Sequence, residues 1–365
     1  MTEYPGLQSP ITPDADALLA NLRREGTPAR VHHMELFHDG EVLKAICERF
    51  GLGEGLSRDD PWFAARRTIE VHRFLGFDYV QSGLMGMEFG FANNTTEDTA
   101  EDAHANGRSY RDNQAGPITS WADFEAYPWP DPTRPEATAA LEFFSENLPE
   151  EMCISCMTGH FCEHLCWMMG YENLCFALFD QPDLVEAIAG RILEYHQKEI
   201  EQILQFPRVR ILWGSDDMGY KTGLMFSAAD MRKYVLSGHR ELAHRAHAAG
   251  RLYLLHSCGN LREIIDDLTD DVQIDGKHSF EDTIEDVRQV KGDYGQKVAL
   301  IGGIDVDFLC RARPEDIRRR VRETLDACLP GGGYALGTGN SVANYIPLDN
   351  YLAMVDEGRQ YAVSG

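Results

Sequence analysis

Short apolar runs recur along the chain, and each ends in a polar or glycine-rich turn before a segment with helical character. β-branched and aromatic residues are common in these runs, as they are in buried strands. Strands that alternate with helices are expected to be parallel, and eight such units close naturally into a (β/α)8 TIM barrel of the α/β class. The eight predicted strands span residues 29–35, 79–85, 152–158, 209–216, 252–258, 272–278, 298–305 and 334–340.

Helix boundary signals separate these runs. Ser227 is an N-cap-like residue before an amphipathic segment that Gly250 ends, and Pro314 opens a second helix with acidic residues in its first turn. An open doubly wound sheet is the structural alternative. No G-x-G-x-x-G or G-x-x-x-x-G-K-[ST] motif follows a predicted strand, which disfavours that alternative.

Two regions interrupt the alternation within what is otherwise a single domain over residues 1–365. Residues 1–28 form an N-terminal extension, and residues 86–150 form a long excursion after the second strand. Its prolines and aromatic residues indicate an ordered segment that folds over the barrel mouth. We expect Trp121 and Trp129 to contribute to a substrate wall there, although such aromatic residues equally often pin a loop to its barrel.

Composition excludes several classes of partner. The net charge of −25 disfavours binding to nucleic acid, whose recognition needs a basic face. No stretch approaches the roughly 20 apolar residues of a membrane span, and the N-terminal residues lack the features of a secretory signal. We therefore expect a cytoplasmic protein whose nine cysteines are reduced thiols.

Candidate chemistry lies at the strand ends, because active sites of such barrels form at the carboxyl ends of the strands. His256 and Cys258 are separated by one residue, so an extended strand points both side chains to the same face. Imidazole nitrogen and thiolate sulfur both suit zinc. The alternative is a purely structural role, with a buried histidine beside an inert core cysteine.

Acidic and polar residues end the other strands. Asp216 and Asp217 are neighbours, so they face opposite ways on a strand and at most one points squarely into the mouth. Helix caps or ion pairs explain such residues as readily as catalysis does. The candidates at the strand ends are Asp216, Asp217, His278 and Asp305 as catalytic groups, and Asn340 with Tyr220 as substrate contacts.

Several motifs carry a family resemblance from residue 27 onward. They are TPARVHHMEL, LLHSCGN, GDYGQKVALIGGID, PEDIRRRVRETLDACLPGGGYALGTGN and IPLDNYLAMVDEGRQY. With them the chain resembles the uroporphyrinogen decarboxylase superfamily, a group of (β/α)8 barrels that includes zinc-dependent corrinoid methyltransferases. The resemblance to the methyltransferase branch, which binds zinc through a His-x-Cys-Gly motif, implies that His256 and Cys258 are zinc ligands.

The sequence departs from the family pattern in two places. True uroporphyrinogen decarboxylases carry an arginine-rich segment at the first strand, where this chain has HHMELFHDG, and this disfavours a porphyrinogen substrate. The methyltransferase branch uses a second cysteine near the eighth strand, where this chain has Asn340. We expect Glu35, at the end of the first predicted strand, to replace that cysteine as the third zinc ligand.

The resemblance implies a methyltransferase that moves a methyl group from a small methylated substrate to a corrinoid on a separate carrier protein. The substrate would be a methyl ether, with aromatic ethers included, a methylamine or a thioether. A homodimer is one expected assembly. The alternatives are a decarboxylase of a small carboxylated substrate, using Asp216, Asp217 or Asp305 without a metal, and a non-catalytic corrinoid-binding barrel.

Overall fold

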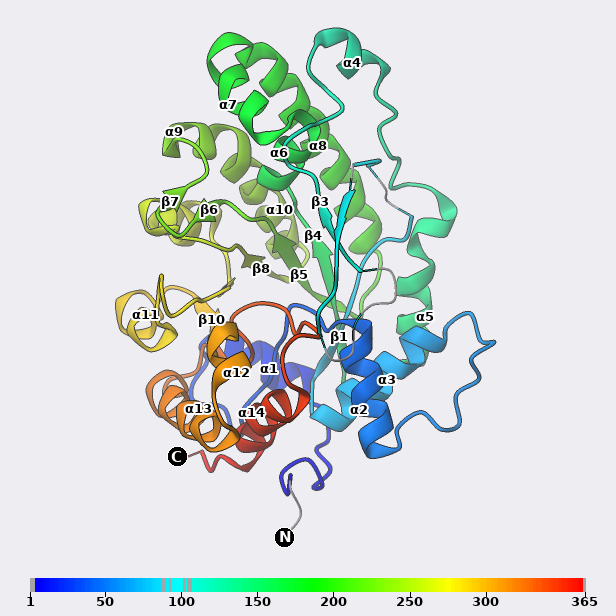
Figure 1. The fold of residues 1–365 in the computed structure, drawn as a ribbon, viewed down its shortest axis with the longest axis vertical. Coiled ribbons are helices and arrows are strands. Elements are labelled where there is room, and N and C mark those ends of the chain that lie inside the picture. Colours follow the sequence, from blue (N-terminus) through cyan, green and yellow to red (C-terminus); the bar gives the residue numbers. More distant parts are fainter. Residues whose placement is uncertain (1–3, 87–88, 92, 101–102, 104–106, 364–365) are drawn as a thin grey trace.

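The computed structural model describes residues 4–86, 89–91, 93–100, 103 and 107–363. Seven parallel strands form one curled sheet with helices around it (Figure 1). The six predicted runs from residue 152 onward, together with the run that starts at Tyr79, supply these strands. In sheet order they are β1 (Tyr79–Ser82), β4 (Cys153–Thr158), β5 (Val209–Ser215), β8 (Leu252–His256), β9 (Gly276–His278), β10 (Ala299–Ile301) and β11 (Tyr334–Ala335).

The first predicted strand, residues 29–35, joins no ladder in the described structure. It lies against β11, where His33 and Leu336 form an isolated parallel bridge. Toward β1, the Tyr79 hydroxyl donates to the Glu35 carbonyl at 2.6 Å and accepts from the Glu35 N–H at 2.9 Å. A side chain thus occupies the backbone groups that a ladder with β1 would need. The curled parallel sheet is consistent with the expected TIM barrel, with this segment between β11 and β1.

Helices follow the strands and surround the sheet (Figure 1). Ser227 accepts from the Asp230 N–H at 3.1 Å, as an N-cap does, but the predicted helix after it divides into a short helix, a π-helical turn at Arg232–Leu236 and α10. The α-helices outside the excursion are α1 (Ala15–Leu22), α2 (Gly40–Phe50), α3 (Phe63–Leu75), α6 (Cys162–Met169), α7 (Tyr171–Asp180), α8 (Pro182–Ile203), α9 (Ala228–Met231), α10 (Ser237–Ala248), α11 (Val287–Asp293), α12 (Val306–Arg311), α13 (Pro314–Cys328) and α14 (Leu348–Gln360).

The core lies between the sheet and these helices and continues inside the curled sheet. Trp213, Tyr253 and Tyr334 are large strand residues that are fully buried. Burial of each such side chain contributes on the order of 2 kcal/mol of hydrophobic stabilisation. All nine cysteines are free thiols, as the sequence predicts. None of the described helices is both long enough and apolar enough to cross a bilayer.

The described part of the excursion contains an antiparallel hairpin, β2 (Asn93–Thr96) and β3 (Arg108–Arg111), followed by α4 (Trp121–Ala126), a 3-10 turn (Pro135–Thr138) and α5 (Ala139–Asn147). Arg108 bonds to Asp39 and Asn344, and the Ile118 N–H bonds to the Met168 carbonyl at 2.9 Å. The excursion therefore bridges segments that follow β11 and β4. Residues 87–88, 92, 101–102 and 104–106 of the predicted excursion, and residues 1–3 and 364–365 of the predicted domain, lie outside the described residues.

The two hydrogen bonds between the Tyr79 hydroxyl and the Glu35 backbone lead to a stability prediction. Tyr79→Phe leaves the buried N–H and carbonyl of Glu35 without this partner, and an unsatisfied buried group costs about 1–3 kcal/mol. We expect the free energy of unfolding, measured by urea denaturation, to fall by that amount. Tyr110→Phe removes an exposed hydroxyl on β3 and is the matched control. Equal unfolding midpoints for the two variants would contradict the role of Tyr79 in holding residues 29–35.

Candidate metal centre

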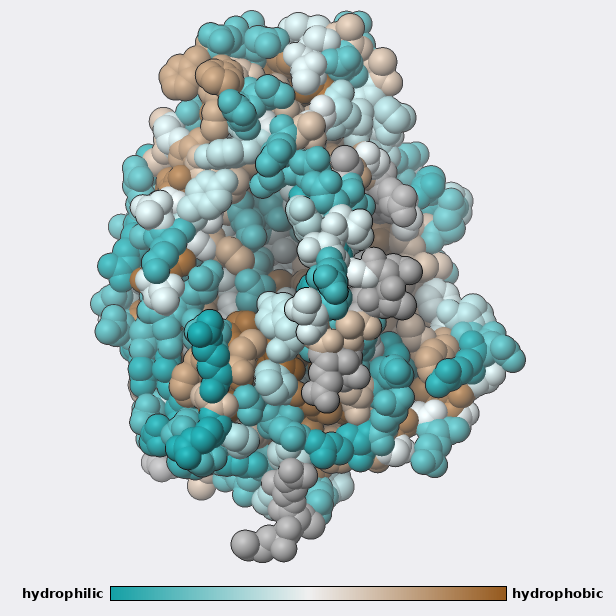
Figure 2. Space-filling model, in the orientation of Figure 1, coloured by the Kyte–Doolittle hydropathy of each residue, from teal (hydrophilic) through white to brown (hydrophobic). Residues whose placement is uncertain are grey.

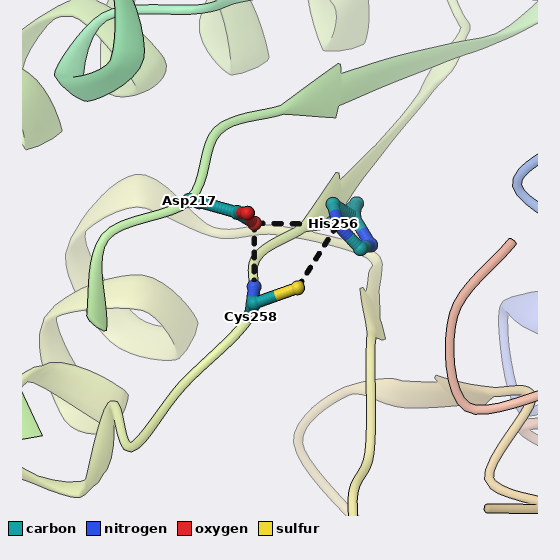
Figure 3. Close-up of side chains that lie close together, drawn as sticks. All are labelled: Asp217, His256 and Cys258. Carbon is teal, nitrogen blue, oxygen red and sulfur yellow. Dashed lines mark hydrogen bonds and ion pairs between the residues drawn. The ribbon is translucent and has the colours of Figure 1, made fainter. Parts of the chain in front are cut away.

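Three side chains converge where β5 and β8 end. Asp217, His256 and Cys258 each offer one ligand atom, and these atoms all lie within 4.8 Å of one another (Figure 3). The parallel register pairs Ser215 with His256, so the residues that follow both strands emerge side by side. Cys258 lies two residues beyond His256, and the pair reaches the same side as same-face geometry predicts. On this face of the molecule the surface is hollowed near its centre, over β5 and β8 (Figure 2).

Short contacts hold the three groups together. The Asp217 Oδ1 atom accepts from the Cys258 N–H at 2.8 Å and lies 3.3 Å from His256 Nε2. The Cys258 Sγ atom lies 3.6 Å from the same Nε2. Asn340 Nδ2 donates to Cys258 Sγ at 3.2 Å. Asn340, expected as a substrate contact, therefore touches the Cys258 sulfur atom.

A hydrogen-bond relay fixes which nitrogen of His256 faces the group. His278 on β9 pairs in register with His256, and its Nε2 donates to the Thr338 carbonyl at 3.2 Å. Its Nδ1 is then the acceptor for the His256 Nδ1–H, at 2.7 Å. His256 Nε2 consequently points at Asp217 and Cys258. An outer partner that sets the tautomer in this way is usual for histidine ligands of metals.

Gly302 makes this relay sterically accessible. Its backbone has φ +78°, and a Cβ there would lie 2.1 Å from the Thr338 carbonyl oxygen and 3.1 Å from the His278 ring. Only glycine lets the backbone approach so closely in this left-handed conformation. The glycines before Asp305 thus shape the centre without contacting the three candidate ligands.

The electrostatics of the group favour a cation. Burial alone disfavours an imidazolium at His256, but the bonds to Asp217 and Cys258 outweigh it and raise the pKa of His256 to about 10. Burial likewise opposes the Asp217 carboxylate, yet its bonds to His256 and Cys258 lower the pKa of Asp217 to about 2. Burial and the neighbouring His256 charge hold the pKa of His278 well below its ordinary value, so His278 is neutral.

The donor set fits zinc. One imidazole nitrogen, one thiol sulfur and one carboxylate oxygen are all zinc ligands, and three protein ligands leave a fourth position for a substrate or water. Among the described residues, no other group of three histidine, cysteine, aspartate or glutamate side chains has its ligand atoms this close together. The residues that would hold the ion are Asp217, His256 and Cys258.

Glu35, which the sequence analysis expected as the third ligand, is not in this group, and Asp217 takes that place. Thr338 donates its N–H to both Glu35 oxygens at 3.1 and 3.0 Å, and its hydroxyl to Oε2 at 2.6 Å. Pairing of residues 32–34 with β11 turns the Glu35 carboxylate onto this backbone. Burial raises the pKa of Glu35 to about 8, against which the Thr338 bonds act only partly.

The other two aspartates expected to be catalytic hold backbone instead. The buried Asp216 carboxylate accepts from the N–H groups of Phe161, Cys162 and Glu163 at 2.8–3.0 Å and from His239 Nε2 at 2.9 Å. Asp216 and Asp217 do diverge, as neighbours leaving a strand should.

Asp305 has a comparable structural role. It caps α12 through the Phe308 N–H at 2.9 Å and also accepts from the Asp282 N–H at 2.9 Å. His278, also expected to be catalytic, orients His256 rather than contacting the open side of the group.

The aromatic candidates have different surroundings. Tyr220 in the β6–β7 hairpin (Gly219–Tyr220 and Gly223–Leu224) is 47% exposed, and its carbonyl accepts from the Asn260 N–H, so it flanks the loop that carries Cys258. Trp121 and Trp129 pack on Phe124 within the excursion, at ring distances of 5.7 and 5.9 Å. Among the described residues, no ring contact joins either tryptophan to the candidate ligands, and packing of the excursion accounts for both.

Sequence reasoning missed a pair beyond the end of β4. His160 Nδ1 lies 2.9 Å from Glu163 Oε2, at the start of α6. The predicted strand ends at Thr158, whose hydroxyl donates to the buried Glu199 at 2.6 Å. The Gly-His pair directly after that threonine was the available signal, because glycine often ends a strand where a functional loop begins.

The buried Glu35 carboxyl generates a pH prediction. Its folded pKa of about 8 lies above its ordinary 4.5, so its stabilising contribution is complete below pH 4.5 and is lost as pH rises through 8. We expect the free energy of unfolding to fall with pH, relative to Glu35→Gln, by up to about 1.4 kcal/mol per pH unit in that window. Denaturation at pH 5, 7 and 9 measures it, with the exposed Glu172→Gln as control. A constant difference between wild type and Glu35→Gln would refute the raised pKa.

A solved structure shares the fold of this chain over nearly its whole length. The chain resembles a methyltransferase from Methanosarcina mazei, with a TM-score of 0.68 and 18% sequence identity over 94% of this chain and 97% of that one. A putative vitamin-B12-independent methionine synthase from Listeria monocytogenes has a TM-score of 0.49 at 14% identity, over 90% of this chain and 95% of that one. No curated protein sequence matches the chain. A family model for uroporphyrinogen decarboxylase (URO-D) matches residues 113–361, more than half of the chain, and the chain therefore belongs to the uroporphyrinogen decarboxylase family.

Proposed function

We propose that this chain is a zinc-dependent methyltransferase that takes a methyl group from a small methylated substrate and passes it to a reduced corrinoid carried by another protein. The observation that carries the proposal is the convergence of Asp217, His256 and Cys258 with His256 Nε2 facing the other two ligand atoms. The methyltransferase named among the solved structures supports it only through a shared fold.

The chain's own residues would bind the ion and orient the substrate. Zinc, when bound by Asp217, His256 and Cys258, would supply a Lewis acid that stabilises negative charge on the substrate heteroatom as the methyl group leaves. His278 keeps His256 in the ligating tautomer, and Asn340 holds the Cys258 side chain by its hydrogen bond. The carboxylate of Asp217 would supply an oxygen ligand in addition to His256 and Cys258.

A cavity of about 850 Å³ has Asn340 in its wall, and Asn340 Nδ2 bonds to Cys258 Sγ, although the three candidate ligands do not themselves line this cavity. Phe280, Phe308 and Tyr345 give it aromatic surfaces, and Asp305 and Asp307 give it a polar side. Its volume is in the range of pockets for small organic molecules. This cavity volume supports a small methylated substrate. We assign the β2–β3 hairpin of the excursion as an element that covers the strand ends.

The structure supports a substrate other than a porphyrinogen. Arg30, the arginine nearest to the first predicted strand end, bonds to the buried Asp78, which also accepts from His32 at 2.7 Å. An arginine neutralised by a buried carboxylate is not available to grip propionate groups. The alternative of a decarboxylase that acts on a small carboxylated substrate also loses support, because the Asp216 and Asp305 carboxylates are bonded to backbone N–H groups.

The decisive experiment combines metal analysis with turnover. Purified protein is incubated with cob(I)alamin, as a soluble stand-in for the carrier-bound corrinoid, and with a panel of O-, N- and S-methyl compounds, while the cobalt absorption is followed. One tightly held zinc per chain and transfer from at least one class support the proposal. A zinc-free protein that transfers no methyl group would overturn it and favour the decarboxylase or corrinoid-binding alternatives.

Removal of the Cys258 thiol should abolish zinc binding without unfolding the protein. Cys258→Ala is expected to lose bound zinc and to lower methyl transfer at least about 100-fold, because one of three protein ligands is gone. Circular dichroism should remain native, since the centre lies at the strand ends outside the core. Cys47→Ala, at a half-buried thiol on α2, is the matched control. Full activity in zinc-free Cys258→Ala would exclude a zinc mechanism.

The His278 relay should be visible in metal affinity. His278→Leu leaves the His256 Nδ1–H without its acceptor, and loss of such an outer partner typically weakens binding about 10–100-fold. Competition with a chromogenic chelator measures the zinc Kd, with the exposed His244→Leu as control. An unchanged Kd would mean that His278 does not orient the ligand.

A further inference from the structure

The segment that follows β4 carries a histidine with one nitrogen bound and the other free. His160 Nδ1 bonds to Glu163 Oε2 at 2.9 Å, and the His160 side chain is 27% exposed. Among the residues that the structure describes, no hydrogen-bond partner is found for His160 Nε2. This arrangement leaves Nε2 of a partly exposed imidazole available to a ligand.

The backbone of this segment is anchored by buried polar groups. His196 Nε2 accepts from the His160 N–H at 3.2 Å, and His196 Nδ1 donates to Glu199 Oε2 at 2.8 Å. Glu199 also accepts from the Thr158 hydroxyl at 2.6 Å. A loop whose position is over-determined in this way holds the His160 ring in one place, as a catalytic group requires.

Asp216 ties the same segment to the candidate metal centre. Its carboxylate binds the N–H groups of Phe161, Cys162 and Glu163, and the next residue along the chain is Asp217. Burial raises the pKa of Glu163 and the nearby Asp217 charge adds to this, while the bond to His160 lowers it. Glu163 therefore lies close enough to Asp217 to sense its charge.

The charge state of His160 suits a proton donor. Burial lowers the pKa of His160, but the Glu163 bond and the charges of Asp216 and Glu199 outweigh burial and leave it raised. Its neighbour His164 stacks on His160 at 5.3 Å and on His196 at 5.4 Å, and burial holds the pKa of His164 well below its ordinary value. Of His160 and His164, only His160 has a raised pKa.

We propose that His160 Nε2–H donates a proton to the substrate heteroatom as the methyl group leaves, with Glu163 as the residue that positions and stabilises the imidazolium. This inference rests on the proposed function. The bond between the methyl carbon and the heteroatom breaks, and its electron pair stays on the heteroatom and takes the proton. The new bond to the methyl carbon uses an electron pair supplied by the reduced corrinoid co-substrate, and His160 regains its proton from solvent.

The proposal also defines the substrate class. Protonation helps most where the leaving group is strongly basic, as an alkoxide or an unactivated phenoxide is. A sulfonium or quaternary ammonium donor releases a neutral group and needs no proton. The His160–Glu163 pair therefore fits an uncharged methyl ether.

The test is the dependence of rate on leaving-group acidity. Wild type, His160→Gln and Glu163→Gln are compared on a series of aryl methyl ethers from 4-nitroanisole to 4-methoxyanisole, at saturating zinc and cob(I)alamin. We expect His160→Gln to lower kcat about 10²- to 10⁴-fold on the most basic leaving groups, and progressively less as the phenol becomes more acidic. Glu163→Gln, which keeps a bond to Nδ1 but not the charge, should show the same trend with a smaller loss.

The controls separate a failure of the proton donor from a failure of the proposed function. Zinc content and melting temperature of both variants should match wild type, and the exposed His244→Gln should leave every rate unchanged. If wild type transfers a methyl group from amines or thioethers but from no ether, the proton donor fails and the proposed function stands; if it transfers none from any methyl compound, both fail. If wild type is active and both variants lose the same factor across the whole series, only the proton donor fails, and His160 has a positioning role.

Discussion

The parallel register of β5, β8 and β9 aligns Ser215, His256 and His278 in one row across the sheet. Because side chains alternate along a strand, this alignment decides which polar groups meet beyond the strand ends. It brings Asp217 beside Cys258 and lets His278 accept from His256. A slip by one residue in either pairing would send these side chains to opposite faces, and the candidate metal centre would not form.

The carboxylates around the centre differ in exposure and partners: Asp216, Asp305 and Glu35 are buried against backbone groups, whereas the partly exposed Asp217 accepts from the Cys258 N–H and also lies beside His256. Asp216 and Asp305 satisfy N–H groups at the starts of α6 and α12, where the helix dipole also favours negative charge. Glu35 satisfies the backbone of Thr338. Each of these bonds offsets the high cost of removing a charge or a polar group from water. Asp217 keeps an oxygen beside His256 and Cys258 and is thereby left for chemistry.

The candidate metal centre and the His160–Glu163 pair share one electrostatic feature. In both, a carboxylate beside a histidine raises the pKa of a ring that burial alone would keep neutral. At His256 the positive charge occupies the place where a divalent cation would bind. At His160 it remains a proton on a ring with one open nitrogen. A strongly acidic chain thus gathers positive charge where proposed methyl transfer develops negative charge on the leaving atom.

Sequence patterns alone predicted much of the framework, because they depend on near neighbours along the chain. Strand periodicity located the segments of all seven sheet strands, and the spacing of His256 and Cys258 placed both on one side. The divergence of Asp216 and Asp217 also follows from alternation. Local pattern could not tell which aspartate faces the mouth, since the choice depends on where α6 begins.

Contacts between distant segments decided the rest. Glu35 bonds to Thr338 across 303 residues, and this long-range pairing removes it from the ligand set that sequence reasoning had assigned. The hydroxyl of Tyr79 likewise replaces a strand ladder beside residues 29–35, and the excursion tryptophans pack on their own segment. Sequence determined which groups each strand end could offer. Only tertiary structure decided which of them are used by backbone and which remain for a ligand, because buried polar groups bond to whatever partner the fold brings within reach.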